Sequence, residues 1–130
     1  MKRIFLTLLL FLALTACGTN EAEQVAEATY QQITAEEAKE MMDTQDVVIL
    51  DVREQHEYDS GHIPGAVLLP VGTITEDTAA AVIEDLDTVV LVYCRSGNRS
   101  KTASQALADL GYTNVYEFGG INDWPYDVES

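Results

Sequence analysis

The residues with the clearest chemical potential are Cys94 to Ser100, which read Cys-Arg-Ser-Gly-Asn-Arg-Ser. They follow an apolar run at residues 89–93, and an amphipathic pattern then extends from residue 100 to residue 110. A buried strand that leads through a short loop into a helix directs several backbone N–H groups at one point. A cysteine there would lie in an anion-binding cradle, with two arginines nearby to favour its thiolate. The pattern predicts a nucleophilic cysteine that holds or transfers a small anionic group.

Two of the predicted strands end next to charged or reactive side chains. The apolar run at residues 47–50 is followed by Asp51 and Arg53, and the run at 89–93 is followed by Cys94. Continuous apolar runs of this kind indicate strands that are covered on both faces, as in a parallel sheet. In open α/β sheets, ligands bind beyond the carboxyl ends of the strands. If the two strands are parallel, Asp51, Arg53 and Cys94 lie at the same edge of the sheet.

Strands and helices alternate along the rest of the chain. Three further strands are expected at residues 30–33, 66–69 and 115–118, and three helices at about 35–42, 73–86 and 100–110. The first two helices begin at capping boxes, Thr34 with Glu37 and Thr73 with Glu76. Gly111 is the expected stop of the third helix. This alternation predicts an α/β domain with a mostly parallel sheet flanked by helices.

The composition limits the classes of partner. A hydrophobic content of 47% and a charged content of 22% are ordinary for a globular domain. The formal net charge of −15 argues against nucleic acid and against a polybasic membrane surface. A small anionic ligand remains compatible with this charge, because a local arginine pocket can bind one.

The N-terminus has the pattern of a sorting signal. Residues 1–3 are basic, and residues 4–14 are apolar apart from Thr7, a stretch shorter than the roughly 20 apolar residues that a spanning helix needs. Residues 14–17, Leu-Thr-Ala-Cys, resemble the lipobox of bacterial lipoproteins. The resemblance implies that residues 1–16 are removed and that Cys17 is lipidated. The alternatives are an ordinary signal with a coincidental cysteine, or an uncleaved anchor.

Residues 17–29 are small, polar and acidic after the cysteine, and we expect them to form a flexible tether. The alternative is a short extra helix, since alanine and glutamate are good helix formers. The predicted organisation is therefore a signal peptide at 1–16, a lipidated tether at 17–29 and a single domain at 30–130. Its expected location is extracytoplasmic, anchored by lipid to a bacterial membrane, at the periplasmic face or the cell surface.

Four segments, in order, resemble the pattern of rhodanese-like sulfurtransferase domains. They are Leu-Asp-Val-Arg at 50–53, Gly-His-Ile-Pro-Gly-Ala at 61–66, the cysteine loop at 94–100 and Gly-Gly-Ile-Asn-Asp-Trp at 119–124. The resemblance spans most of the chain from about residue 30. It implies a rhodanese-like three-layer sandwich with a five-stranded, mostly parallel sheet flanked by helices.

The resemblance also implies a chemistry. The Cys94 thiolate would take the outer sulfur of an anionic donor such as thiosulfate and pass it from a persulfide to cyanide or a thiol. Backbone N–H groups of residues 95–99 would converge on the sulfur, within a loop of Arg95, Ser96, Gly97, Asn98, Arg99 and Ser100. The start of the following helix would add about half a positive charge. Arg95 and Arg99 would orient an oxyanion donor and stabilise the leaving sulfite. No cofactor is expected.

Three residues outside the loop have alternative roles. Asp51 either pairs with an arginine of the loop or caps a helix start, and a supporting structural role is favoured over that of a general base. Arg53 is either a charge in the pocket or part of a surface ion pair. His62 lies in a stretch that is mainly architectural in the resembling family. With two histidines in the chain and no clustered cysteines, we expect no metal site.

Two other functions fit part of the pattern. Cysteine phosphatases and arsenate reductases of related fold use Cys-x5-Arg, whereas Arg99 follows Cys94 after four residues and position 100 is Ser. The shorter loop favours one sulfur atom over a phosphate as cargo. The non-enzymatic alternative is a persulfide carrier or binding module. In either case Cys94 has no second free cysteine to resolve it, so a reductant would be an external thiol.

Overall fold

The computed structural model describes residues 27–130. The predicted signal peptide, the predicted lipidation site Cys17 and the predicted tether up to residue 26 lie outside the described residues. Within residues 27–130, no helix is both long enough and apolar enough to cross a membrane.

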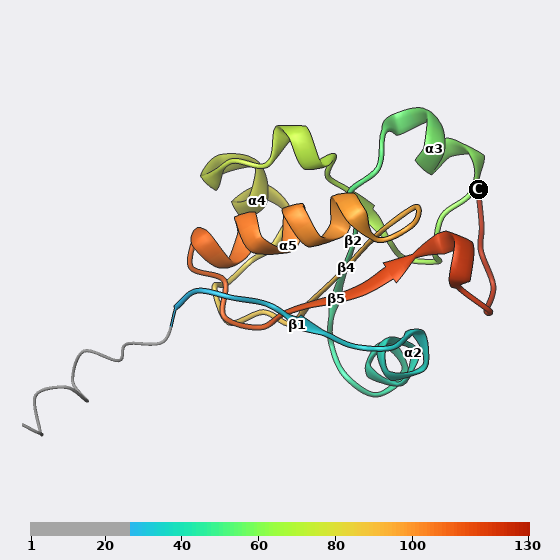
Figure 1. Cartoon of the computed structure of the whole chain (residues 1–130), viewed down its shortest axis with the longest axis horizontal. Helices are drawn as coiled ribbons and strands as arrows, with labels where there is room; N and C mark the ends of the chain where they lie inside the picture. The colour runs from blue at the N-terminus through green and yellow to red at the C-terminus, as the bar shows by residue number, and fades with distance from the viewer. Residues whose placement is uncertain (1–26) are drawn as a thin grey trace, which may run out of the picture.

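A single sheet forms the centre of the described chain (Figure 1). Its strands are β1 (Gln31–Gln32), β2 (Val48–Asp51), β3 (Val67–Leu68), β4 (Val90–Cys94) and β5 (Val115–Gly120). The strand order is β1-β5-β4-β2-β3, and every pair of neighbouring strands is parallel. The predicted α/β architecture with five strands is confirmed. The two strands that precede Asp51 and Cys94 are direct neighbours, so their carboxyl ends meet at one edge.

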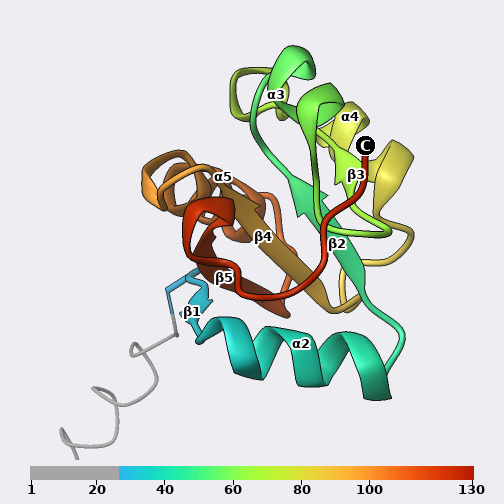
Figure 2. The same ribbon diagram turned by 90° about the vertical axis from the view of Figure 1, so that its right-hand side faces the viewer.

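Helices cover both faces of this sheet, which makes three layers. They are α2 (Ala35–Thr44), α3 (Gln55–Ser60), α4 (Glu76–Val82) and α5 (Asn98–Asp109), with two short 3₁₀ turns at Val71–Thr73 and Ile121–Asp123. Figures 1 and 2 show α4 and α5 on one face and α2 on the other. The α2 start is the predicted capping box, in which Thr34 accepts from the Glu37 N–H and Glu37 accepts from the Thr34 N–H.

The sheet separates two hydrophobic clusters, and β4 contributes to both. Val90, Val92 and Cys94 belong to the cluster under α4 and α5, whereas Leu91 and Tyr93 belong to the cluster under α2. Side chains alternate between the two faces of a strand, so a strand covered on both sides is apolar throughout. The same alternation directs Cys94 toward α5 and Tyr93 toward the opposite face.

Two local predictions differ from the structure. The segment at 73–86 does not form one helix from Thr73, because α4 begins after Thr75, whose hydroxyl accepts from the Thr78 N–H. Thr73 instead ends the preceding 3₁₀ turn, and its hydroxyl donates a hydrogen bond to the Pro70 carbonyl. Helix α3 was not expected, because its residues, Gln-His-Glu-Tyr-Asp-Ser, lack apolar periodicity.

Candidate active site

Cys94 is the last residue of β4, and the loop after it is shorter than the sequence pattern suggested. Helix α5 begins at Asn98 rather than Ser100, because Gly97 takes the N-cap position with a φ of 110°. Residues with a side chain rarely adopt this left-handed backbone, whereas glycine does so at little cost. Arg99 and Ser100 consequently lie in the first turn of the helix, with Ser100 facing Cys94.

The Cys94 sulfur is buried and surrounded by neutral donors. The Gly97 N–H points at Sγ with a donor–acceptor distance of 3.0 Å, and the Ser100 hydroxyl oxygen lies 3.4 Å from Sγ. Burial raises the pKa of the thiol, but the Ser100 hydroxyl and the backbone N–H groups of Ser100, Gly97 and Ser96 outweigh it, so the pKa of Cys94 is lowered. The donors thus come from Ser96, Gly97 and Ser100, not evenly from residues 95–99.

The end of β5 packs against the backbone of this loop. A Cβ atom on Gly120 would lie only 2.0 Å from the Arg95 carbonyl oxygen, so no residue with a side chain fits there without moving the loop. The same carbonyl accepts the Asn122 N–H at 3.1 Å. These contacts explain why the segment Gly-Gly-Ile-Asn accompanies the cysteine loop. The Arg95 side chain itself is exposed.

Arg99 is bound to Glu57, a residue that the sequence did not single out. Its two terminal nitrogens donate to the two carboxylate oxygens of Glu57 at 2.8 and 3.0 Å. This bidentate bond is the main reason why the pKa of Glu57 falls to about 2. Glu57 first, and then the negative charges of Cys94 and Glu54, raise the pKa of Arg99. Helix α3 therefore fixes the second arginine of the loop.

Asp51 and Arg53 form a buried pair on the opposite face of the sheet from Cys94. The Arg53 Nε and backbone N–H donate to Asp51 Oδ1 at 2.9 and 3.0 Å, and its terminal nitrogen donates to Oδ2 at 2.7 Å. The Tyr93 hydroxyl also donates to Oδ2, at 2.7 Å. Asp51 is fully buried and Arg53 is 4% exposed. The pair is neither a surface ion pair nor a charge beside Cys94, and Asp51 caps no helix.

Arg53 also connects β2 to the segment around His62, since its guanidinium donates to the Gly61 carbonyl at 2.7 Å. His62 Nδ1 lies 2.9 Å from the Tyr58 carbonyl oxygen, and its ring stacks on Tyr58. These contacts are architectural. Within residues 27–130, no group of three or more histidine, cysteine or acidic side chains could hold a metal ion.

Glu117 is the second residue that the sequence did not single out. It is 2% exposed, and its Oε2 accepts from the Ser100 hydroxyl at 2.5 Å and from the Gly119 N–H at 3.0 Å. Its Oε1 accepts from the Gln32 side-chain amide at 3.1 Å. A single charged residue in a strand usually faces water, so nothing local in the sequence distinguishes this one. Its burial depends on β1 and α5.

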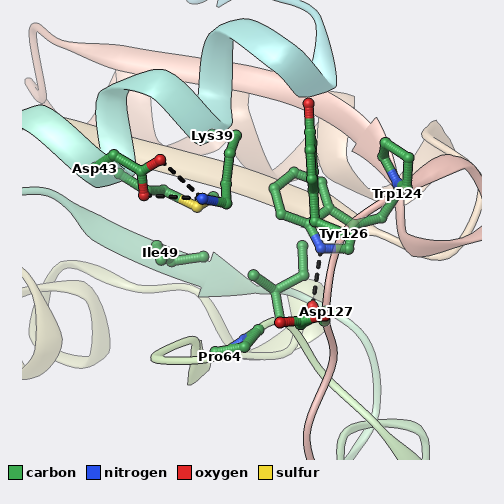
Figure 3. A pocket seen from close by; sticks show the side chains of 10 residues that line it. Lys39, Asp43, Ile49, Pro64, Trp124, Tyr126 and Asp127 are labelled. Carbon is green, nitrogen blue, oxygen red and sulfur yellow. Dashed lines mark hydrogen bonds and ion pairs between the residues drawn. The ribbon is translucent and has the colours of Figure 1, made fainter.

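A separate cavity of about 640 Å³ lies on the α2 face, between α2 and the C-terminal segment (Figure 3). Two pairs of its polar groups are bonded to each other. Lys39 donates to both Asp43 carboxylate oxygens at 2.8 and 2.9 Å, and the Trp124 indole N–H donates to the Asp127 carbonyl at 3.0 Å. No residue of the cysteine loop lines it, so the cavity is distinct from the Cys94 site.

Comparison with known proteins gives a consistent result. The model of the family described as the rhodanese-like domain matches residues 34–126. The thiosulfate sulfurtransferase GlpE of Coxiella burnetii is 38% identical over 96 residues, which cover 73% of this chain and 87% of GlpE. The thiosulfate sulfurtransferase PspE of Escherichia coli is 39% identical over 74 residues, covering 57% of this chain and 70% of PspE.

Among solved structures, a rhodanese with anions from E. coli superposes with a TM-score of 0.61 at 29% identity. The match covers 65% of this chain and 99% of that structure. The fold that the four sequence segments implied is therefore confirmed.

Proposed function

Because the chain belongs to the rhodanese-like domain family, we propose that it is a sulfurtransferase that acts through a persulfide on Cys94. The sulfur would come from an anionic donor such as thiosulfate and pass to cyanide or a thiol. The observation that carries this proposal is the position of the Cys94 sulfur, 3.0 Å from the Gly97 N–H at the start of α5. Donors already aimed at a buried anion stabilise it without further reorganisation.

The transfer has two steps. In the first, the Cys94 thiolate attacks the outer sulfur of thiosulfate; a new sulfur–sulfur bond forms, and sulfite leaves with the electron pair of the old one. In the second, cyanide attacks the outer sulfur of the persulfide, thiocyanate leaves, and the thiolate is restored. Each step begins and ends with one anion on the cysteine. The neutral donors of Ser96, Gly97 and Ser100 suit both the thiolate and the persulfide anion. The lowered pKa of Cys94 favours the thiolate.

The contacts of the loop favour sulfur over phosphate as cargo. The position at which a Cys-x5-Arg loop would carry its arginine is Ser100, whose hydroxyl lies 3.4 Å from the sulfur. Arg99 is engaged by Glu57 rather than directed over Cys94. A tetrahedral phosphate would lack the bidentate guanidinium that such loops supply.

An assay with thiosulfate and cyanide tests the proposal directly. We expect the purified full-length chain to form thiocyanate, and Cys94→Ser to abolish this activity because its hydroxyl is a far weaker nucleophile than a thiolate. Cys17→Ser is the matched control and should retain full activity. Activity in Cys94→Ser would contradict the mechanism. Release of phosphate from an aryl phosphate, without thiocyanate formation, would favour the phosphatase, and persulfide formation without turnover would favour the carrier.

We also propose that the domain is held at a bacterial membrane, on its extracytoplasmic side, by lipid on Cys17. The support is the sequence of residues 1–17 alone. In cells fed a labelled fatty acid, the wild-type chain should carry the label and sediment with membranes, whereas Cys17→Ala should do neither. Equal labelling of the two chains would contradict the proposal.

A further inference from the structure

The transfer of sulfur described above makes no use of Glu117, although it is a buried acid close to the reactive cysteine. The donors to its carboxylate are Gln32, Ser100 and the backbone N–H of Gly119, all of which are neutral. None of the ion pairs within residues 27–130 includes it. A carboxylate buried without a cation is costly, and such a group commonly changes its protonation state instead.

Ser100 connects this carboxyl group to the sulfur. Its Oγ lies 2.5 Å from Glu117 Oε2 and 3.4 Å from Cys94 Sγ, and Ser100 is fully buried. A hydroxyl has one proton to donate. It can donate this proton to an anionic carboxylate or to an anionic sulfur, but not to both. If both groups were ionised, one of them would face the lone pairs of the Ser100 oxygen.

Counting protons gives two arrangements of equal charge. In the first, Cys94 is a thiol whose S–H faces Ser100, and the Ser100 hydroxyl donates to the Glu117 carboxylate. In the second, the sulfur has given its proton to Ser100 Oγ, which has passed its own to the carboxyl group. The Glu117 O–H then donates to Ser100, and the Ser100 O–H donates to the thiolate. Each arrangement carries one negative charge, whereas the doubly ionised state carries two.

Few other charged groups act on Cys94, Ser100 and Glu117. From α5, Arg99 acts on Cys94, but Glu57 of α3 binds its guanidinium. From β1, only the neutral amide of Gln32 reaches Glu117. Among residues 27–130, no charged side chain forms a hydrogen bond or ion pair with the Glu117 carboxylate, and Ser100 connects it to Cys94.

We propose that Glu117 is a positioning residue of the Cys94 site which, through Ser100, takes up the proton that leaves the Cys94 thiol. The sulfur can then be anionic without a second buried anion behind it. During attack on thiosulfate, a thiolate and a dianion become a persulfide anion and a sulfite dianion, so the proton stays on Glu117. The inference rests on the proposed function only where it concerns the attack on thiosulfate. The proton shared by Cys94 and Glu117 is a property of the resting protein.

The number of protons released when Cys94 is alkylated tests this proposal with Cys94, Ser100 and Glu117 all unsubstituted. The full-length chain with Cys17→Ala has Cys94 as its one thiol, and the ultraviolet absorbance of the thiolate identifies a pH at which Cys94 has ionised. At that pH, iodoacetamide converts the thiolate to a neutral thioether. We expect one proton to be released per Cys94 alkylated, because the Glu117 carboxyl group loses its proton once the sulfur beside it is no longer an anion. Release of no proton would overturn the proposal, whether or not the protein transfers sulfur.

Substitutions test the connection through Ser100. Glu117→Gln should abolish the proton release, because a glutamine amide cannot hold the proton. The pH at which the Cys94 thiolate forms should change little, since Glu117 is already neutral when the thiolate is present. Ser100→Ala removes the hydroxyl that connects the two groups, and it should reduce the release to less than half a proton per Cys94 alkylated. Glu84→Gln, which removes an exposed charge, is the matched control.

Two results would overturn the proposal: a full proton released in Ser100→Ala, or as much proton release in Glu117→Gln as in Glu84→Gln. If Glu117→Gln does not fold, the proton-release measurement on the unsubstituted residue decides the question.

Discussion

Asp51 and Glu117 are both buried carboxyl groups, and each lies on a strand that neighbours β4. Asp51 is bound by the Arg53 guanidinium and the Tyr93 hydroxyl. Glu117 has only neutral donors, and one of them, Ser100, also reaches the Cys94 sulfur.

The difference separates a structural charge from one that can take part in chemistry. A carboxylate with a bidentate cation fixes the elements around it. The terminal nitrogen of Arg53 that donates to Asp51 Oδ2 also donates to the Gly61 carbonyl, so the pair ties β2 to the loop that follows α3. A buried carboxyl group without a cation can take up a proton at smaller cost. We therefore expect substitutions at the Asp51 site to reduce stability and substitutions at the Cys94 site to change reactivity.

The largest expected effect is on stability. Arg53→Ala leaves the buried Asp51 without its cation, and it should lower the free energy of unfolding by about 3–5 kcal/mol in urea titrations. The double variant Asp51→Asn with Arg53→Met removes both charges and should recover most of this loss. Lys39→Ala breaks an exposed pair and should cost far less than Arg53→Ala. An equal cost for Arg53→Ala and Lys39→Ala would contradict the structural role of the buried pair.

The next effect is on reactivity. Gly120→Ala places a Cβ atom 2.0 Å from the Arg95 carbonyl oxygen and must displace the cysteine loop. We expect thiocyanate formation to fall by about 100-fold, as small displacements of reacting groups typically cost. Gly72→Ala, whose Cβ would meet no atom within 4 Å, is the matched control. If both variants keep full activity, the loop geometry does not control the reaction.

The smallest effect concerns the bond that joins α3 to the cysteine loop. The pKa of Glu57 is about 2 in the folded chain, below its ordinary 4.5, so the Arg99 bond stabilises the fold above about pH 4.5. This contribution is lost as the pH falls toward 2. Glu57→Gln should therefore be less stable than the wild type by up to about 1 kcal/mol at neutral pH, with the gap closing in acid. A gap that does not change in urea titrations between neutral pH and acid would contradict this linkage.

The sequence predicted the elements whose signals are local. The apolar runs before Asp51 and Cys94 became neighbouring parallel strands, and Thr34 with Glu37 became the capping box of α2. The predicted start of α4 at Thr73 was wrong. Thr75, two residues later, offers the same capping chemistry and is the N-cap of the helix. Helix α3 could not be predicted from periodicity, because none of its residues is buried.

The site was predictable only in part, for the same reason. Cys94 and its loop are contiguous in the chain, so spacing alone located them. Glu57 and Glu117 come from α3 and β5, and their partners lie 42 and 17 residues away in sequence. Such contacts depend on the tertiary fold rather than on any local pattern.

The proposed mechanism requires Cys94 to receive a sulfur atom. Intact-mass spectrometry of the full-length chain after incubation with thiosulfate, followed by peptide mapping, tests it most directly. We expect the mass to rise by one sulfur atom, located on Cys94 and removed by cyanide, with no change in Cys94→Ser. A wild-type chain that gains no sulfur, or a Cys94→Ser chain that gains the same mass, would contradict the account.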